Sequence, residues 1–233
     1  MTEYLFAPAL NRSVRVRGQR AEYPVNRIFC VGRNYEAHAV EMGGAVDREA
    51  PWYFTKSAVT AVCPSGATVP YPPGTANFHH EMELVLALGA PVFKADLAAA
   101  QAAIYAYGSG LDMTRRDRQQ DGKDHRRPWD LGKDIENGAV LGDLTLASEV
   151  GTLDGRRIHL SVNGTLRQDA MLDEMVWSPA EVISHLSRFY HLAPGDIIMT
   201  GTPAGVGAVV AGDVITGGID GLAPVSLTLA AAE

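Results

Sequence analysis

Apolar residues recur mainly in short runs in which polar and apolar positions alternate, the pattern typical of β-strands. Helical spacing, with apolar residues three and four positions apart, is rarer and is confined to three segments, 34–42, 97–105 and 179–189. Strands are predicted over the ranges 26–32, 51–56, 79–88, 105–112, 158–162 and 196–200, with further short strands towards the C-terminus. Many strands and few helices predict an α+β, mostly β fold.

Several local signals mark where these elements begin and end. Asn163-Gly164 follows an alternating strand and predicts a hairpin with a type I′ turn. Ser178-Pro179-Ala180-Glu181 is a capping box with proline at the first helical position. Asp96 and Asn34 are each placed to cap a helix that begins just after them.

Length and charge narrow the class of protein. The 233 residues suit one catalytic domain, predicted over 26–233 and preceded by a short N-terminal segment, 1–25. The net charge of −7 argues against nucleic acid or an anionic membrane as a partner. No apolar run approaches the length of a membrane span, and no secretory leader is expected. Cys30 and Cys63 are therefore expected to be reduced, in a soluble cytoplasmic protein that acts on a small molecule.

The most informative stretch is the run from His79 to Leu86, which contains Glu81 and Glu83. In a strand, residues two apart point to the same face, so both carboxylates would leave the sheet together. With Asp112, which ends a later strand, they would form an all-oxygen site suited to Mg²⁺ or Mn²⁺. The alternative is an edge strand whose solvent face carries two glutamates.

A second candidate group lies on the first predicted helix. His38 and Glu41 are three residues apart and therefore share one helical face. Glycines before and after this helix, Gly32 and Gly43-Gly44, make it a candidate lid over an active site. The alternative is a surface His–Glu pair. A nucleophilic Cys30–His38 pair is disfavoured, because an apolar strand around Cys30 would disfavour its thiolate.

Four further residues carry candidate chemistry. Arg116 and Gln119, three apart, follow Asp112 within a strongly charged segment, and Lys133 follows a glycine. The glycine-rich stretch 201–207 lacks the signature of a nucleotide-binding loop, but Thr202 and its neighbouring backbone N–H groups could bind a carboxylate. A plain turn is the alternative for this stretch.

Taken together, these motifs resemble the fumarylacetoacetate hydrolase superfamily from Val31 to the C-terminus. The His-His-Glu form, with Arg116, Gln119 and Pro128-Trp129, resembles its acylpyruvate hydrolase branch. Within that branch, the segments 114–117 and 126–130 are most similar to fumarylpyruvate hydrolases of gentisate breakdown. The motifs that carry the resemblance are Gly32-Arg33-Asn34-Tyr35, His80-Glu81-x-Glu83, Leu111-Asp112-Met113-Thr114, Gly132-Lys133, Pro194-Gly195-Asp196 and 200–207.

The resemblance implies a twisted β-roll with a few short helices, a homodimer, and Mg²⁺ or Mn²⁺ held by three carboxylates. Carried over to this sequence, it implies residue roles as follows. The metal ligands are Glu81, Glu83 and Asp112; the catalytic residues are His38, Glu41 and Lys133; the substrate-binding residues are Arg33, Tyr35, Arg116, Gln119 and Thr202.

Two departures from the family pattern limit what is carried over. Lys56 is followed by Ser57 where the family usually has proline, so Lys56 is left out of the expected site. The residues after Lys133, 134–137, also differ, which leaves the acyl end of the substrate open.

The expected activity is hydrolysis of the C–C bond of a 3-acylpyruvate, in particular of fumarylpyruvate to fumarate and pyruvate. The alternatives within the family are oxaloacetate decarboxylation, general acylpyruvate cleavage and keto–enol isomerisation. Outside it, the alternative is a metal- or ligand-binding protein without catalysis.

Overall fold

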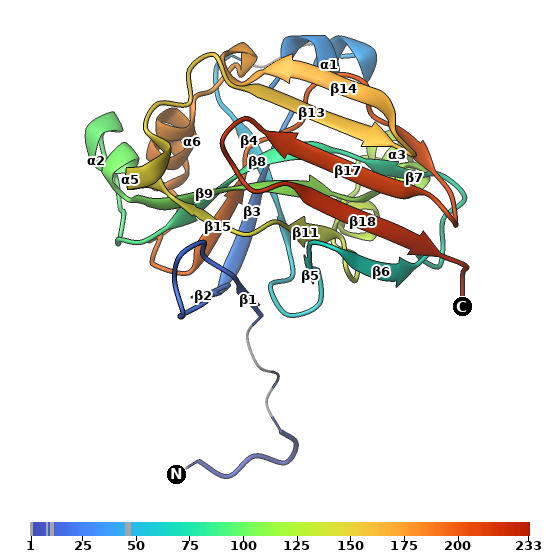
Figure 1. Cartoon of the computed structure of the whole chain (residues 1–233), viewed down its shortest axis with the longest axis horizontal. Coiled ribbons are helices and arrows are strands. Elements are labelled where there is room, and N and C mark those ends of the chain that lie inside the picture. The colour runs from blue at the N-terminus through green and yellow to red at the C-terminus, as the bar shows by residue number, and fades with distance from the viewer. Residues whose placement is uncertain (1, 8, 10–11, 45–47) are drawn as a thin grey trace.

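The computed structural model describes residues 2–7, 9, 12–44 and 48–233. In these residues two large, curved β-sheets pack on each other, and short helices lie at their margins (Figure 1). The predicted α+β, mostly β roll with a few short helices is confirmed. The division into 1–25 and 26–233 stays a prediction, and its first part includes positions outside the described residues.

The largest sheet has eight strands and carries the acidic motif. Strand β8 lies in its middle, paired antiparallel with β15 on one side and β9 on the other. Its strands, in spatial order, are β4 (Trp52–Lys56), β3 (Arg27–Gly32), β15 (Asp196–Met199), β8 (Met82–Leu88), β9 (Ile104–Asp112), β11 (Ala139–Leu141) and β5 (Val62–Pro64), with β12 (Thr145–Leu146) paired to β9.

The second large sheet has five strands, and two smaller sheets complete the β structure of the described residues. The five-stranded sheet has the order β14 (Thr165–Met171), β13 (Arg157–Val162), β17 (Val214–Ile219), β18 (Val225–Ala230) and β6 (Ala67–Pro70). A three-stranded sheet has the order β10 (Thr114–Arg115), β7 (Phe78–His80) and β16 (Gly207–Val209), and β1 (Ser13–Val14) pairs with β2 (Tyr23–Pro24).

Both faces of β8 are buried, because successive side chains of a strand point to opposite sides. Met82 and Leu84 belong to the apolar cluster that also contains Ile158 of β13, between the two large sheets. Val85 and Ala87 belong to a second cluster, which the β1–β2 hairpin closes. A strand covered on both sides has little freedom to move, so β8 is a rigid support for the acidic residues at its start.

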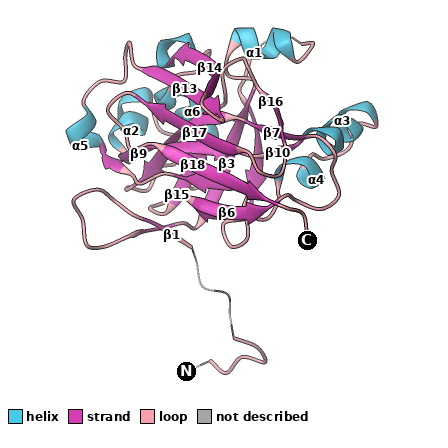
Figure 2. Ribbon diagram, turned by 45° about the vertical axis from the view of Figure 1, so that its right-hand side comes forward, coloured by secondary structure: helices cyan, strands magenta, loops and turns pink. Residues whose placement is uncertain are grey.

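Helices are short and lie at the ends of the sheets (Figure 2). α3 and α4 pack together beside β10, whereas α2 and α6 pack together at another margin. The helices are α1 (Glu36–Glu41), α2 (Leu97–Ala102), α3 (Arg116–Asp124), α4 (Asp130–Lys133), α5 (Ala147–Val150) and α6 (Pro179–Leu186), with a 3₁₀ turn at Leu172–Glu174. No helix of the described residues is long and apolar enough to span a membrane.

Most local signals of the sequence are confirmed. Asn163 and Gly164 both have positive φ, 50° and 76°, as a type I′ turn requires. Ser178 accepts a hydrogen bond from the Glu181 N–H, and the Glu181 carboxylate accepts one from the Ser178 N–H, which completes the capping box. The Asp96 side chain caps α2 as expected.

Three local predictions were wrong. Asn34 does not cap α1; its side chain instead bonds Trp177 and the carbonyl of Thr200, contacts that no local pattern encodes. The alanine-rich helix ends at Ala102 rather than Tyr105, because Ile104 already pairs with β8. Phe189 lies beyond the end of α6 and is 67% exposed, not on its buried side.

Candidate active site

The three predicted carboxylates meet at one end of β8. Glu83 lies in β8, Asp112 ends β9, and Glu81 lies in the break between β7 and β8 rather than within a strand. The Asp112 N–H donates to the Glu81 carbonyl at 2.9 Å, so the two backbones are adjacent. One oxygen of each carboxylate lies within 4.8 Å of the others, and all three side chains are buried. We call these residues the acidic triad.

Three cations face the triad. The Lys133 ammonium lies 2.6 Å from Glu81 Oε2 and 2.5 Å from Asp112 Oδ2. Lys56 lies 2.7 Å from Asp112 Oδ1, and the Arg116 guanidinium donates to Glu81. Burial opposes the ionisation of Glu81, but Lys133 and Arg116 outweigh it and hold its pKa well below the usual range. Glu81 is therefore a carboxylate at neutral pH.

Glu83 has a different environment. It accepts a hydrogen bond from the Gly201 N–H at 2.8 Å, and no ion pair to it is present among the described residues. Burial, followed by the negative charges of Asp112 and Glu81, raises the pKa of Glu83 well above its usual range. Asp112 Oδ1 also accepts no hydrogen bond of good geometry, although Lys56 is near. Glu83 thus has no cationic partner among the described residues, and three buried carboxylates in this arrangement can bind a divalent metal of the Mg²⁺ or Mn²⁺ type.

His38 and Glu41 form a pair on α1. His38 Nδ1 lies 3.3 Å from Glu41 Oε2, and because a carboxylate only accepts, Nδ1 carries the proton and Nε2 is left as the base. Burial lowers the pKa of His38, and the nearby Glu81 and Glu41 only partly oppose this. The imidazole is therefore neutral at neutral pH, the form a general base requires.

The glycine-rich loop 201–207 makes hydrogen bonds to both the acidic triad and the His38–Glu41 pair, so it is more than a plain turn. Gly201 donates to Glu83, and the Gly205 N–H donates to Glu41 at 3.1 Å. The Thr202 hydroxyl accepts a hydrogen bond from the buried Gln168 at 2.8 Å. Gly205 has a φ of +94°, and a Cβ there would lie 2.0 Å from the Arg167 carbonyl oxygen, so only glycine fits.

Arg116 is held from three directions. It donates to Glu81, to Gln119 Oε1 at 2.6 Å, and through Nε to His79 Nδ1 at 3.4 Å. Burial, together with the charge of Arg116, lowers the pKa of His79 to about 4, so its ring is neutral and can accept this bond. The guanidinium is therefore fixed with one edge towards the triad.

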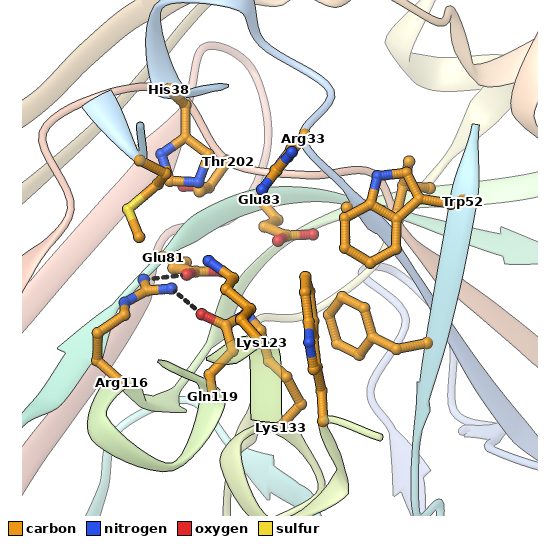
Figure 3. Close-up of a pocket in the computed structure, with 15 residues that line it drawn as sticks. Arg33, His38, Trp52, Glu81, Glu83, Arg116, Gln119, Lys123, Lys133 and Thr202 are labelled. Carbon is orange, nitrogen blue, oxygen red and sulfur yellow. Dashed lines mark hydrogen bonds and ion pairs between the residues drawn. The ribbon is translucent and has the colours of Figure 1, made fainter. Parts of the chain in front are cut away.

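Most of the predicted site residues line a single pocket (Figure 3). In this view His38, Thr202 and Arg33 lie on one side, and Arg116, Gln119, Lys123 and Lys133 on the other, with Glu81 and Glu83 between them. Tyr35 does not line it; the Tyr35 side chain is buried, and its hydroxyl has no hydrogen-bond partner among the described residues. The pocket volume is about 30 Å³, so side chains must move before a substrate enters.

Sequence reasoning missed two residues of this site. Leaving Lys56 out was wrong, because its fully buried ammonium pairs with Asp112 whatever residue follows it. The only sequence signal was a lysine that ends an aromatic strand. Gln168 is also fully buried; it bonds Thr202 and the backbone N–H of Met82, and so connects the glycine loop to β8. No local signal distinguishes Gln168 from an exposed residue of a hairpin strand.

Fold and site together define a class: a mostly β protein with a buried carboxylate site for a divalent metal, faced by the His38–Glu41 pair. The family model described as "Fumarylacetoacetate (FAA) hydrolase C-terminal" matches residues 27–230. The chain therefore belongs to the fumarylacetoacetate hydrolase family, as the motifs of the sequence indicated.

Individual relatives refine this assignment. The chain is 52% identical over 194 residues to a fumarylpyruvate hydrolase from Ralstonia sp., covering 82% of this chain and 100% of that protein. It is 37% identical over 206 residues to an oxaloacetate tautomerase of Escherichia coli, covering 88% and 93%. Among solved structures, it is similar to fumarylpyruvate hydrolase from Pseudomonas aeruginosa in complex with Mn²⁺ and pyruvate, with a TM-score of 0.93 and 44% identity over 98% of this chain and 100% of that one.

Proposed function

We propose that this protein is a metal-dependent hydrolase that cleaves the C–C bond of a 3-acylpyruvate, with fumarylpyruvate as the substrate and fumarate and pyruvate as the products. The observation that carries the proposal is that Glu81 and Glu83 of the buried acidic triad line one pocket with a neutral His38, while Asp112 is buried beside them. The fumarylpyruvate hydrolases among the relatives support the choice of substrate.

Glu81, Glu83 and Asp112 would hold Mg²⁺ or Mn²⁺. When bound, the metal supplies Lewis-acid chemistry, which polarises the oxygens of the pyruvyl group. Lys56 and Lys133 flank the triad and fix the orientation of the Asp112 side chain. The solved structure of the Pseudomonas aeruginosa relative in complex with Mn²⁺ supports this choice of ion.

His38 is the general base of the proposed reaction. Its Nε2 takes a proton from water as the water oxygen adds to the acyl carbonyl carbon, and Glu41 holds the imidazole in the required tautomer. The bond between this carbon and the methylene carbon of the pyruvyl group then breaks. Its electron pair passes into the pyruvate enolate, which a proton converts to pyruvate, so one water is consumed for each substrate cleaved.

The remaining pocket residues bind and polarise the substrate in this proposal. Lys133 and Gln119 face the charge that develops on the pyruvyl oxygens, and Arg116 and Thr202 bind the pyruvyl carboxylate. Arg33 is a further substrate-binding residue, because it lines the pocket. Tyr35, predicted to bind substrate as well, is buried and does not line the pocket, so direct contact with substrate is not part of the proposal.

The test follows the enol absorbance of fumarylpyruvate, beside acetylpyruvate and oxaloacetate, with Mg²⁺ and then with EDTA. Fast loss of fumarylpyruvate that requires the metal, with fumarate and pyruvate as products, is expected. Equal or faster loss of acetylpyruvate would support hydrolysis of acylpyruvates but contradict fumarylpyruvate as the preferred substrate. Loss of oxaloacetate alone would contradict hydrolysis.

Oxaloacetate tautomerisation is the second candidate, favoured by the relatives of that name at 36–40% identity. It uses the same polarised 2-keto acid and one base, but no water adds to a carbonyl. Proton exchange at the methylene carbon of oxaloacetate, without formation of pyruvate, would distinguish it. Decarboxylation of oxaloacetate would release pyruvate and CO₂ instead.

The proposal includes four further elements. One catalytic domain over 26–233 is supported by the family match at 27–230. A cytoplasmic location is supported by the two buried free thiols, Cys30 and Cys63. A homodimer and a role in gentisate degradation are supported by the family resemblance, and light scattering of the purified protein tests the dimer.

A further inference from the structure

The basic side chains around the pocket differ in whether a carboxylate faces them. Lys56, Lys133 and Arg116 pair with the acidic triad. Arg33 and Lys123 line the same pocket and are only partly exposed, yet neither forms an ion pair with any described residue. Partly buried cations without a counter-ion are unfavourable, so their presence on a pocket wall indicates an anionic ligand.

An aromatic frame holds these two cations in place. The Arg33 guanidinium carbon lies 5.9 Å from the ring centroid of Trp52, and the Lys123 ammonium lies 5.3 Å from that of Trp129. The two indole rings pack edge to face, with centroids 4.5 Å apart. Cation–π contact orients a cation without neutralising it, so both charges stay available to a ligand.

The surroundings of both side chains restrict them further. Gly44, which follows α1 in the chain, lies close to Arg33: a Cβ built on Gly44 would be 2.9 Å from Arg33 Nη1. Burial, and then the charges of Arg116 and Arg33, lowers the pKa of Lys123 to about 8. The Lys123 ammonium therefore lies near other positive charges, and a second anionic group in the pocket would stabilise its charged form.

Charge counting points to the same conclusion. The five basic residues exceed the three carboxylates of the triad, and a divalent metal would increase the excess. One substrate carboxylate, at the proposed Arg116–Thr202 position, compensates only part of it. Figure 3 shows Arg33 and Lys123 on opposite sides of the pocket, with Lys123 on the same side as Arg116, which belongs to the same helix, α3.

We propose that Arg33 and Lys123, framed by Trp52 and Trp129, form a subsite for the second carboxylate of a dicarboxylic acylpyruvate and select this substrate class over acylpyruvates with an uncharged acyl end. The inference rests on the proposed function and adds to it the residues that determine specificity. Lys123 has no role in the proposed bond cleavage itself.

The test compares fumarylpyruvate with crotonylpyruvate, in which a methyl group replaces the distal carboxylate and the rest of the chain is the same. The measured quantity is the ratio of kcat/KM for the two substrates. Lys123→Met is expected to lower this ratio about 10- to 100-fold, the effect of losing a hydrogen bond between charged groups. Lys123→Arg is expected to retain most of the wild-type ratio, whereas Arg33→Met is expected to lower the ratio as Lys123→Met does.

Arg127 offers a matched control. It is exposed and lines a neighbouring aromatic cavity of about 460 Å³, which shares Trp52 and Trp129 with the catalytic pocket. Arg127→Gln is expected to leave the ratio as in the wild type. An unchanged ratio in both Lys123→Met and Arg33→Met, or a lowered ratio in Arg127→Gln alone, overturns the proposal.

A binding measurement separates this inference from the proposed function. If the wild type cleaves neither substrate, the hydrolase proposal fails, and calorimetric titration of the Mg²⁺-loaded protein with fumarate and crotonate tests the subsite. Tighter binding of fumarate than of crotonate, with the difference lost in Lys123→Met, supports the subsite. Equal binding of the two acids to the wild type contradicts it.

Discussion

Two of the walls of the catalytic pocket are built differently. The wall of the acidic triad stands on β8 and β9, two buried strands that are each paired on both sides. The opposite wall is α1, a helix of six residues, and the Glu41 side chain on it is 35% exposed. Only the first wall is part of the central sheet, so only that wall is fixed by the packing of the core.

The difference between the rigid strands and the short helix suits the two requirements of the site, metal binding and substrate entry. Metal ligands must hold a defined geometry, which rigid strands provide. A substrate must enter a pocket with only about 30 Å³ of free space, so one wall has to move. α1 joins the glycine loop through the Glu41–Gly205 hydrogen bonds, and glycine residues flank it, so we expect α1 to be the wall that opens.

The largest effect is expected on the rigid wall. Asp112→Asn should abolish Mn²⁺ binding and lower turnover by at least about 10³-fold, because the metal supplies several kcal/mol of stabilisation in the transition state. It also leaves Lys56 and Lys133 without their shared partner, which we expect to cost about 3–5 kcal/mol of unfolding free energy. Calorimetric metal titration, turnover and thermal unfolding measure these effects.

The exposed Asp154, in a turn, provides the control for this variant. Asp154→Asn is expected to behave as the wild type in all three measurements. Retention of Mn²⁺ binding by Asp112→Asn would show that Glu81 and Glu83 alone form the metal site.

On the α1 wall, we expect one substitution to affect catalysis without affecting metal binding. His38→Ala is expected to lower kcat by about 10²–10⁴-fold, the contribution of a general base, with Mn²⁺ affinity unchanged. The exposed His125 on the outer side of the protein is the matched control, and His125→Ala should retain wild-type turnover. Full turnover by metal-loaded His38→Ala would remove His38 from the mechanism.

Glu41 allows the orientation of His38 to be distinguished from the docking of α1. Glu41→Gln keeps an oxygen that can accept from Gly205, whereas Glu41→Ala loses it. We expect kcat to fall roughly 10-fold in Glu41→Gln and roughly 100-fold in Glu41→Ala, the range seen when a partner that orients an imidazole is removed. Amide hydrogen exchange over residues 36–41 should accelerate in Glu41→Ala only, and equal exchange in both variants would contradict the docking role.

The smallest effect concerns pH. Only neutral His38 can act as a base, and burial lowers its pKa, so the neutral form persists to lower pH than in an exposed histidine. The acid limb of kcat/KM is therefore expected below the usual histidine value of about 6.5. Because Glu41 favours the charged imidazole, Glu41→Gln should move this limb to still lower pH. An acid limb above that value would assign it to another group.

Residue patterns were sufficient for the local structure and for much of the site. The Ser178–Glu181 capping box and the Asn163-Gly164 turn depend on interactions within four residues, so the sequence encodes them directly. The spacing of Glu81, Glu83 and Asp112, in the context of the other motifs, was enough to predict one acidic site and the family.

Tertiary structure alone decided which partners the polar side chains take. Lys56 pairs with Asp112, Gln168 connects β8 to the glycine loop, and Asn34 bonds Thr200 instead of capping α1. Even the shortest of these contacts, between Gln168 and Thr202, spans 34 residues of sequence. The same holds for Arg33 and Lys123, which form no ion pair with any residue that the structure describes, beside three paired cations. A buried polar group takes whichever partner the packing of distant elements brings within reach, because leaving it unpaired is unfavourable, and no local pattern of residues contains that information.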